Sequence, residues 1–582
     1  MWTEFGRRAP SDQRRHGDPF PLPRLTEPRL ADSLTRRLDG VLRSLNSLAA
    51  ADFSMTANKD LSLTRVQLWM LEDLLRRVAN YGPELKFRED EALADLLCNA
   101  NLYGQEATTV ASFNADEIKI LGRQLKPTPA SDLAPPEVCQ YLEGFSNMVE
   151  RSPEELETLR LSQDLVEPHW DIKLKQSRQS RFELYSRLFK CGLLTYRRRQ
   201  KARVGMFAVV KKGNKAGNSQ RLIVDCRQAN AMMRKPPSTR LATAAGLTCM
   251  DFSEDALANN GFDMTGQDVP SPGMETGDVG DCFYNFSVPR ACSWFSTGDT
   301  VTRAEMRQWG MEVDSIFDDD SCCQTPLLEE ETVYVCFGGM PMGWSWALWM
   351  ANEIICHQAS LDVDGTPLEL VRDKRVAPPI RPSEPPIGVY VDNVHTFGGK
   401  TGEAGSRMQQ IAQRFEDLRI PFEVDYVDGA TTLDTLGLTF DFSDGVRVRS
   451  KRERAWRLWY ATKCLLRRRR VNGDVIRVWL GHVNFHFLLS RPLLSTLSAC
   501  YRFAISHTGH RFPIWPSVRK EMKTVLGLIF AVERNLSAPV NPEVHIGDAS
   551  DCGLGLMKTC STPFRVLREI KYQERWRFEM MV

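Results

Sequence analysis

The chain has 582 residues, of which 42% are hydrophobic and 26% charged, and its formal net charge is +1. This length predicts several domains or subdomains, and the near-neutral charge argues against a uniformly basic protein. The cysteines form no Cys-x-x-Cys pair and no apolar run is long enough to cross a bilayer, which argues against a zinc ribbon, a secreted disulfide framework and a membrane partner, and predicts a soluble, intracellular protein.

The first part of the chain predicts a short disordered arm followed by helices. Residues 1–27 are rich in Pro and Arg without periodicity, which is typical of disorder. Apolar residues then recur at helical spacing over residues 30–48 and 66–78. We therefore expect an N-terminal helical region over residues 28–150, and the sequence assigns it no role.

Helix signals continue in the next region. Ser152, Pro153 and Glu155 together form a helix start, which predicts a helix toward residue 165. A further helix is expected over residues 181–194, directly before a series of strand-like runs.

Two acidic residues that lie far apart in the chain each stand at the end of a strand-like run. β-favouring residues surround Asp278 in residues 276–288 and alternate around Asp392 in residues 387–394, so both runs predict strands. Asp392 and Asn393 suit the turn of a hairpin, because both residue types tolerate the dihedral angles of a tight bend. Taken singly, Asp278 also suits a helix cap and Asp392 an ordinary turn.

A pair of carboxylates in this setting is typical of metal-dependent nucleotidyl transfer. Charge develops on the attacking, leaving and phosphoryl oxygens, and two magnesium ions about 3.5–4 Å apart neutralise it. Magnesium is usually held by one or two carboxylates together with substrate phosphates. Asp278 and Asp392 are therefore the candidate metal ligands.

Further motifs make the chain resemble the reverse transcriptases of retroviruses and retrotransposons. Besides the two acidic strands, they are Met206-Phe-Ala-Val-Val-Lys-Lys with Arg221-Leu-Ile-Val-Asp, Gly338-Gly-Met-Pro-Met-Gly-Trp, and Leu436-Gly-Leu. They resemble, in this order, the fingers hairpin, the template- and nucleotide-binding turn, and the hairpin that supports the primer. The resemblance covers residues 180–560 and implies an α+β fold, a right-hand polymerase with fingers and palm over residues 151–445.

The resemblance implies an RNA-directed DNA polymerase in which Asp278, Val279 and Asp392 hold Mg2+, or Mn2+ in its place, and Asn393 assists. The family signature ends in two aspartates, so Asn393 keeps an oxygen ligand and loses a charge. The 3′-hydroxyl of a primer on an RNA or DNA template attacks the α-phosphate of a dNTP in this family, and pyrophosphate leaves.

The implied dNTP contacts come from three segments. Lys211 and Arg221 grip the triphosphate, where Arg offers a planar fork and Lys a compact charge. Phe283 screens the sugar and leaves no room for a 2′-hydroxyl. Gly343 lets the backbone approach the nucleotide closely, and Met342 stands where the family has glutamine, so one polar contact is missing.

Two other groups of charged residues have structural interpretations. Asp225 and Arg227 are expected to form a structural ion pair. Asp318, Asp319 and Asp320 lie in an unusually long acidic connection, which we interpret as a solvated loop, since three consecutive side chains cannot all face one ion.

Basic and aromatic residues interleave over residues 451–470, which predicts an amphipathic helix with a charged side suited to phosphate and its aromatic side in the core. A second helix is expected over residues 474–489. The pair resembles a polymerase thumb, assigned to residues 446–510. His482 and His486 lie one turn apart on the second helix, but no Glu or Cys stands between them, which argues against zinc.

The last part of the chain resembles the beginning of a nuclease. Residues 544–556 resemble the opening strands of a ribonuclease H domain, and Asp548 matches its first metal ligand. That fold needs further carboxylates over a longer segment, so residues 541–582 predict a truncated, ribonuclease H-like segment. Residues 511–540 are then a connection between it and the thumb.

Three hypotheses remain open at this point. The first is the retroelement polymerase. The second is a catalytically decayed copy that only binds primer–template nucleic acid, which Asn393, Met342 and the truncated nuclease favour. The third is a host interaction protein that acts through its N-terminal helices. The sequence does not indicate the oligomeric state.

Overall fold

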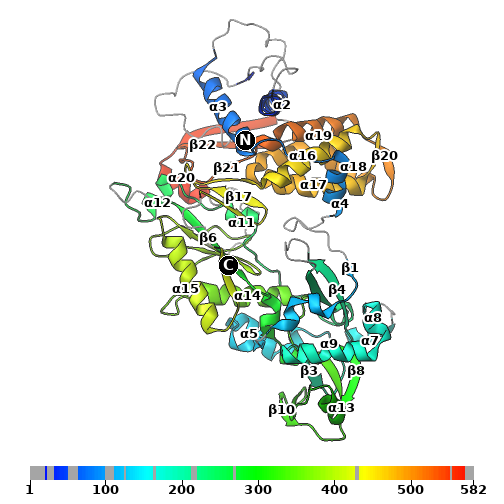
Figure 1. The fold of residues 1–582 in the computed structure, drawn as a ribbon. Coiled ribbons are helices and arrows are strands. Elements are labelled where there is room, and N and C mark those ends of the chain that lie inside the picture. The colour runs from blue at the N-terminus through cyan, green and yellow to red at the C-terminus, as the bar shows by residue number, and fades with distance from the viewer. Residues whose placement is uncertain are drawn as a thin grey trace.

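The computed structural model describes residues 20–22, 32–49, 63–98, 110–123, 126–161, 166–211, 219–265, 271–425, 431–550 and 553–570. Helices and mostly antiparallel sheets are mixed along these residues, in agreement with an α+β class. Two hydrophobic cores organise them. The first core occupies the lower part of Figure 1, and the second core includes the helices of its upper part.

A five-stranded sheet lies between the two cores. Its order is β12-β13-β14-β6-β15, and all neighbours are antiparallel except β12 and β13. The strands are β6 (Gly273–Val279), β12 (Leu370–Val371), β13 (Ile387–Tyr390), β14 (Asn393–Gly398) and β15 (Phe422–Asp425). Val389 and Val394 belong to the first core, whereas Met274 and Phe397 belong to the second. The strands predicted around Asp392 are confirmed. At Asp278 the strand lies mostly before the acid and ends at Val279, and Cys282–Asn285 form a short 3-10 helix where the sequence predicted a strand.

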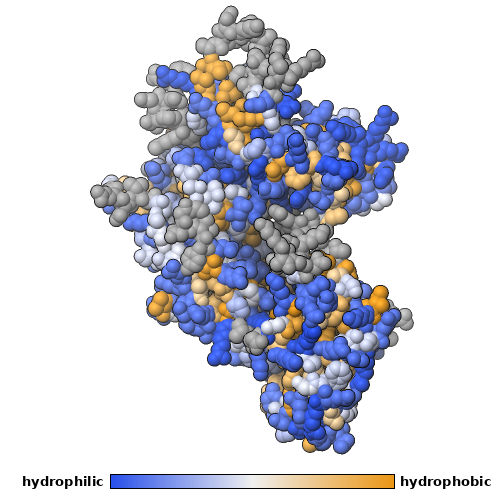
Figure 2. Space-filling model, in the orientation of Figure 1, coloured by the Kyte–Doolittle hydropathy of each residue, from blue (hydrophilic) through white to orange (hydrophobic). Residues whose placement is uncertain are grey.

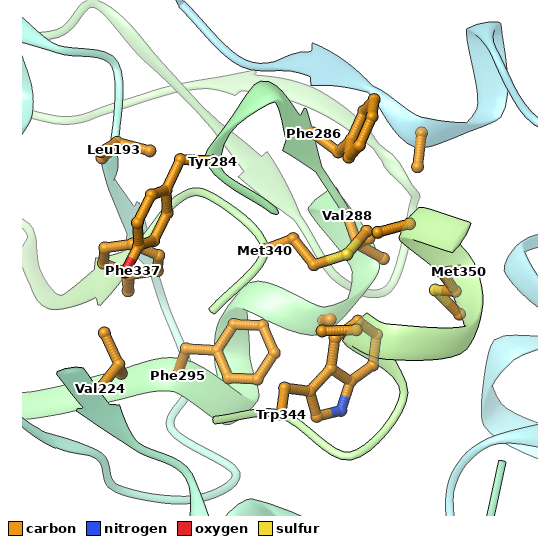
Figure 3. Packing of buried hydrophobic residues seen from close by; sticks show 14 of the residues in the cluster. Leu193, Val224, Tyr284, Phe286, Val288, Phe295, Phe337, Met340, Trp344 and Met350 are labelled. Atoms are coloured by element: carbon orange, nitrogen blue, oxygen red, sulfur yellow. The ribbon is translucent and has the colours of Figure 1, made fainter. Parts of the chain in front are cut away.

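The first core packs aromatic and sulfur-containing side chains against one another (Figure 3). Phe295 meets Trp344 edge-on with ring centroids 5.4 Å apart, and Tyr284 meets Phe337 in the same way at 6.0 Å. Burying one such side chain stabilises the fold by about 1.5–3 kcal/mol. Helices α14 (Ala347–Ser360) and α15 (Glu403–Asp417) cover the sheet from this region.

Two smaller sheets and several helices complete the lower part of the molecule. The first sheet has the order β1-β4-β5 and the second β3-β11-β8. Their strands are β1 (Val110–Ala111), β3 (Leu194–Arg197), β4 (Gly205–Lys211), β5 (Ser219–Asp225), β8 (Ser296–Thr302) and β11 (Thr332–Phe337). The neighbouring helices are α5 (Pro136–Glu143), α6 (Phe145–Met148), α7 (Pro153–Leu161), α8 (Ile172–Gln176) and α9 (Arg178–Lys190). Ser152 and Glu155 exchange the two hydrogen bonds of a capping box at the start of α7, as predicted.

The second core unites the N-terminal helices with those near the other end of the chain. The N-terminal helices are α2 (Ser33–Leu48), α3 (Arg65–Asn80) and α4 (Glu89–Cys98). They pack with α16 (Arg452–Arg467), α17 (Gly473–Phe487), α18 (Ser498–Ser506) and α19 (Pro516–Leu528). The helices predicted over residues 451–470 and 474–489 are thus present, and Trp456 is fully buried in the core as expected. Residues 110–149 instead contribute to the first core, so the region 28–150 is divided between the two cores.

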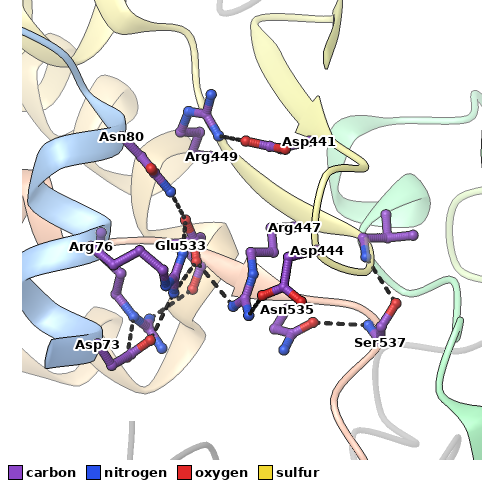
Figure 4. Close-up of polar contacts among 12 residues, drawn as sticks. Asp73, Arg76, Asn80, Asp441, Asp444, Arg447, Arg449, Glu533, Asn535 and Ser537 are labelled. Carbon is purple, nitrogen blue, oxygen red and sulfur yellow. Dashed lines mark hydrogen bonds and ion pairs between the residues drawn. The ribbon is translucent and has the colours of Figure 1, made fainter. Parts of the chain in front are cut away.

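A buried carboxylate joins α3 to the other elements of the second core (Figure 4). Glu533 is only 1% exposed and accepts hydrogen bonds from Arg76 at 2.7 and 3.2 Å and from Asn80 at 3.1 Å. Arg447 lies 3.6 Å from the same carboxylate. Arg447 belongs to a four-stranded sheet of order β16-β17-β18-β21, with strands β16 (Thr432–Thr435), β17 (Leu438–Asp441), β18 (Arg447–Ser450) and β21 (Arg534–Asn535).

The long acidic connection is not a plain solvated loop. It forms a hairpin of β9 (Ser315–Asp318) and β10 (Cys323–Pro326), and its three consecutive aspartates face three consecutive arginines. The pairs are Arg197 with Asp319 at 3.5 Å, Arg198 with Asp318 at 3.8 Å, and Arg199 with Asp320 at 2.9 Å. Sequence patterns did not reveal this match, because the two runs are far apart in the chain.

The described chain ends in the hairpin β22 (Glu543–Ser550) and β23 (Gly553–Cys560), followed by α20 (Pro563–Ile570). The strands predicted over residues 544–556 are thus present. Residues 1–19, part of the expected disordered arm, lie outside the described ranges. Within those ranges, no helix combines the length and the apolar character that crossing a membrane requires.

Candidate active site

Strand pairing brings the two candidate metal ligands together. β6 and β14 are antiparallel neighbours in which Asp278 lies directly opposite Asn393, and the N–H of Val279 donates to the carbonyl of Asp392 at 2.8 Å. Opposite residues of such a pair have Cα atoms about 4.5–5.5 Å apart. Burial raises the pKa of the Cys282 thiol well above its ordinary value, and the charges of Asp392 and Asp278 both add to the rise. Both carboxylates therefore stand at one end of the sheet.

The turn that carries Asp392 is held in an uncommon conformation. Tyr390 pairs with Asn393, which leaves Val391 and Asp392 as a two-residue loop. The predicted hairpin is thus present, but its turn lies one residue earlier than the Asp392–Asn393 turn that we expected, and Asn393 begins β14. Val391 has a φ of 60°, which is rare for a β-branched residue but is what the first position of such a loop requires. Its N–H donates to the side-chain oxygen of Asn352, a buried residue of α14, at 3.2 Å. The strain is therefore maintained by a specific contact from outside the hairpin.

Asn393 acts on Asp392 directly. Its amide nitrogen donates to Oδ1 of Asp392 at 2.9 Å, so one carboxylate oxygen has a fixed direction. An aspartate in place of Asn393 would set two like charges at this distance. The asparagine thus functions here as a donor that orients its neighbour, whereas the sequence suggested an oxygen ligand.

The donor set suits a divalent cation whose coordination is completed by a substrate. Asp278 is exposed, and Asp392 is half-buried. On the other side of β6, Glu423 of β15 is paired with Asp278 and is also exposed. No group of three or more metal-binding side chains occurs among the described residues. Two carboxylates with phosphate oxygens from a substrate are the arrangement in which Mg2+ is usually bound.

The residues expected to contact a nucleotide come from neighbouring elements. Phe283 lies in a short 3-10 helix of residues Cys282–Asn285, and its partly buried side chain packs against the first core. The residue before this helix, Asp281, has a left-handed backbone with a φ of 50°. Tyr284, the residue after Phe283, donates its hydroxyl to the carbonyl of Leu222 on β5 at 3.0 Å. Arg221 is exposed on β5, and its charge acts on Tyr284 against the rise in pKa that burial causes. Phe283 and Arg221 therefore lie in one region of the molecule.

Lys211 is the last residue of β4 and pairs with Ser219, the first residue of β5. Its side chain lies outside the described part, so its expected contact with triphosphate stays a prediction. At the other end of this hairpin, Arg227 lies 2.7 Å from Asp225, and His169 donates its N–H to the same carboxylate at 2.7 Å. The structural ion pair expected there is confirmed.

Gly343 is required for a reason that the sequence did not reveal. A Cβ at this position would lie 2.3 Å from the carbonyl oxygen of Val224, so the turn packs tightly onto β5. Asn230 clamps the same turn, since it donates to the carbonyl of Gly343 and accepts from the N–H of Ser345, both at 2.8 Å. The glycine thus allows close approach to a strand of the chain itself, and Met342 beside it is 37% exposed.

Asn352 and Asn230 are the positioning residues that sequence reasoning missed. The signal for Asn352 is an amide that follows the apolar first turn of α14, because a buried amide needs a partner. Asn230 lies five residues after the end of the fingers motif, but its partner lies on a distant turn. Glu423 lies on a strand without any motif, and only its register opposite Asp278 reveals it.

The basic helix α16 is neutralised in part by the N-terminal helix α4. Glu89 lies 3.4 Å from Lys463 and 2.8 Å from Arg467, and Asp95 lies 3.7 Å from Arg457. The face expected to meet phosphate is therefore partly covered by acids from the start of the chain. These ion pairs join segments that lie far apart in the chain, so the sequence pattern of α16 alone did not predict them.

A run of exposed arginines follows the end of α16. Arg468, Arg469 and Arg470 are exposed, and across the described ranges no carboxylate lies within ion-pair distance of them. Arg470 begins β19 (Arg470–Asn472), which pairs with β20 (Arg511–Pro513). In Figure 2 the region of these strands is strongly hydrophilic. Such a surface attracts a polyanion.

The histidines of α17 are engaged within the protein. Burial lowers the pKa of His486 to about 4, and its ring nitrogens bond to the Ser450 hydroxyl and the Ile529 carbonyl, both at 2.7 Å. His482 lies 3.1 Å from the carbonyl of Leu96.

Asp548 lies in β22 opposite Gly555, and its side chain is outside the described part, so its expected role stays a prediction.

No protein-family model and no curated protein matches the chain.

Proposed function

We propose that the protein is the RNA-directed DNA polymerase of a retroelement, which transfers a nucleotide from dNTP to the 3′-hydroxyl of a primer. The observation that carries the proposal is the pairing of β6 with β14. It sets Asp278 opposite Asn393 and beside Asp392, at one end of an antiparallel sheet. The resemblance of the surrounding motifs to reverse transcriptases supplies the reaction and the substrates.

The arrangement of the described elements supports the right-hand form of this proposal. The five-stranded sheet with α14 and α15 corresponds to a palm, and the β4–β5 hairpin to part of the fingers. α16 and α17 correspond to a thumb, with α4 added to its basic face. In Figure 1 the helices of the second core and the lower part of the molecule lie on opposite sides of the sheet that carries Asp278.

In this proposal, the chain's own residues bind and orient the reactants. Bound Mg2+ or Mn2+ neutralises charge on the phosphoryl oxygens. Asn393 directs one oxygen of Asp392, and Asn352 fixes the loop that carries this aspartate. Arg221 attracts the triphosphate from β5, and Phe283 limits the space at the sugar.

The test is primer extension by the purified protein on RNA and DNA templates, in Mg2+ and in Mn2+. We expect Asp278→Asn to lower the extension rate by about 100-fold or more, because the loss of a metal-binding charge removes several kcal/mol of transition-state stabilisation. Its affinity for primer–template should stay within about twofold of the original value.

The matched control is Asp425→Asn, which removes an exposed carboxylate from the same sheet. Extension should be unchanged in this variant. A protein that extends no primer with either cation contradicts the proposal. If that protein still binds primer–template, the second candidate holds, a catalytically decayed copy, which Asn393 and the absence of a polar side chain at Met342 favour.

A further inference from the structure

A buried histidine stands next to the candidate active site without a role in the chemistry described so far. His395 lies on β14, two residues beyond Asn393 and on the same face of the strand, because side chains alternate along a strand. It is fully buried, with 0% exposure. Burying an imidazole is costly unless both of its nitrogens find partners.

Both ring nitrogens of His395 have partners, and these lie on two different sheets. Nδ1 lies 3.3 Å from the carbonyl of Gly388 on the neighbouring strand β13, and Nε2 lies 2.7 Å from the hydroxyl of Thr435 on β16. Burial lowers the pKa of His395 to about 4, so the ring is neutral near pH 7. A neutral ring has one donor and one acceptor, which fits a carbonyl at Nδ1 and a hydroxyl donor at Nε2.

Thr435 immediately precedes a tight turn. It pairs with Leu438, so Leu436 and Gly437 form a two-residue loop, with φ values of 46° and 77°. The carbonyl of Gly437 accepts from the N–H of Lys451 at 3.0 Å, which fixes the turn to the start of α16. The His395–Thr435 hydrogen bond therefore joins the strand that follows Asp392 to the base of this turn.

We infer that His395 is a positioning residue: its bond to Thr435 sets the position of the Leu436–Gly437 turn relative to the hairpin that carries Asp392. This inference rests on the proposed function and on the resemblance of Leu436-Gly-Leu to the hairpin that supports the primer in reverse transcriptases. The attacking oxygen must lie about 3–3.5 Å from the phosphorus, and a displacement of about 1 Å costs roughly 100-fold in rate. A bond that couples the two hairpins therefore acts on the chemical step and leaves the affinity for duplex unchanged.

The test compares Thr435→Val, which removes the hydroxyl at nearly constant shape, with Thr435→Ser, which keeps it. We expect the single-turnover extension rate at saturating dNTP to fall about tenfold or more in T435V and to stay within about twofold in T435S. The Kd for primer–template should change by less than about twofold in both. Thr435→Ala provides the same comparison if T435V does not fold.

Two further readouts separate positioning from stability. His395→Phe should lower the rate at least as much as T435V, and the double variant should be no slower than H395F, because all three variants lack the His395–Thr435 bond. Equal extension rates for T435V and T435S, measured well below their melting temperatures, overturn the inference and leave the proposed function intact. If the original protein extends no primer, the proposed function fails first, and the inference falls with it.

Discussion

At the residue scale, the candidate site depends on how one carboxylate is oriented. Asp392 sits in a two-residue loop whose strained first residue, Val391, is held by Asn352, and its own oxygen accepts from Asn393. A carboxylate with one fixed oxygen loses less freedom when it binds a cation, since part of its orientation is already set. The asparagine is therefore compatible with a working site.

Replacing Asn393 with aspartate tests this view. The change removes the donor and sets two like charges side by side, so we expect Asn393→Asp to lower stability without divalent cations by about 1 kcal/mol, the worth of one such hydrogen bond. Adding Mg2+ or Mn2+ should reduce the difference, because a bound cation relieves the repulsion and stabilises the folded state. Thermal unfolding during a metal titration measures both effects.

The control for this titration is Asn147→Asp, an exposed position on α6. It should show the same response to metal as the original protein. If N393D also responds in that way, no cation binds beside Asp392.

At the scale of elements, the chain contains two arginine runs with opposite surroundings. Arg197, Arg198 and Arg199 are each paired with an aspartate of the β9–β10 hairpin. In the run from Arg467 to Arg470, only the first residue has a carboxylate partner within the described ranges, and that partner is Glu89. Because adjacent unneutralised guanidinium groups repel each other, the open run is the better surface for phosphate.

We predict that the triple variant R468Q/R469Q/R470Q binds duplex primer–template with a weaker salt dependence. Each lost phosphate contact lowers the slope of log K against log salt by about 0.9, so the slope should decrease by about 2–3. Binding titrations at several salt concentrations give the slope directly.

A matched control carries the same loss of charge elsewhere. R199Q/R307Q/R381Q removes three arginines that are each paired with carboxylates. Its slope should equal that of the original protein. Equal slopes for all three proteins would show that the open run does not contact the duplex.

At the scale of the whole molecule, the N-terminal helices are part of the second core. α2 and α4 pack on α19 and α16, and α3 is fastened by the buried Glu533 (Figure 4). These contacts also join α2, α3 and α4 to elements that lie more than 350 residues further along the chain. Their buried apolar residues pack within the second core, whereas Leu48 of α2 and Leu68 and Leu75 of α3 are exposed. A role for these helices in binding a host protein therefore stays a hypothesis.

The Glu533 contact predicts a large effect on stability. Glu533→Gln removes the buried charge that accepts hydrogen bonds from Arg76 and Asn80, while Arg76 keeps its ion pair with Asp73. Weakening hydrogen bonds to a buried charged group costs about 1–3 kcal/mol. We expect the variant to unfold at lower denaturant concentration and to expose α3 to limited proteolysis.

Asp90→Asn provides the reference, since Asp90 pairs with Arg88 at an exposed position. Such a surface pair contributes about 0–1 kcal/mol. Equal stability of E533Q and D90N would show that Glu533 does not hold α3 in place.

The sequence by itself determined the local features. Alternating apolar residues predicted the strands around Asp392, and residue preferences placed the turn of their hairpin within one residue of its observed position. Charge spacing predicted the Asp225–Arg227 pair. Each of these depends on residues close together in the chain, where periodicity and turn chemistry leave a direct signal.

Only the tertiary structure decided which of these features meet. The register of β6 between β14 and β15 set Asp278 opposite Asn393 and Glu423, and packing brought Asn352, His395 and Glu89 to their partners. The reason is physical: such contacts join segments far apart in the chain, through single hydrogen bonds or ion pairs, and a contact of that kind produces no periodic pattern in the sequence.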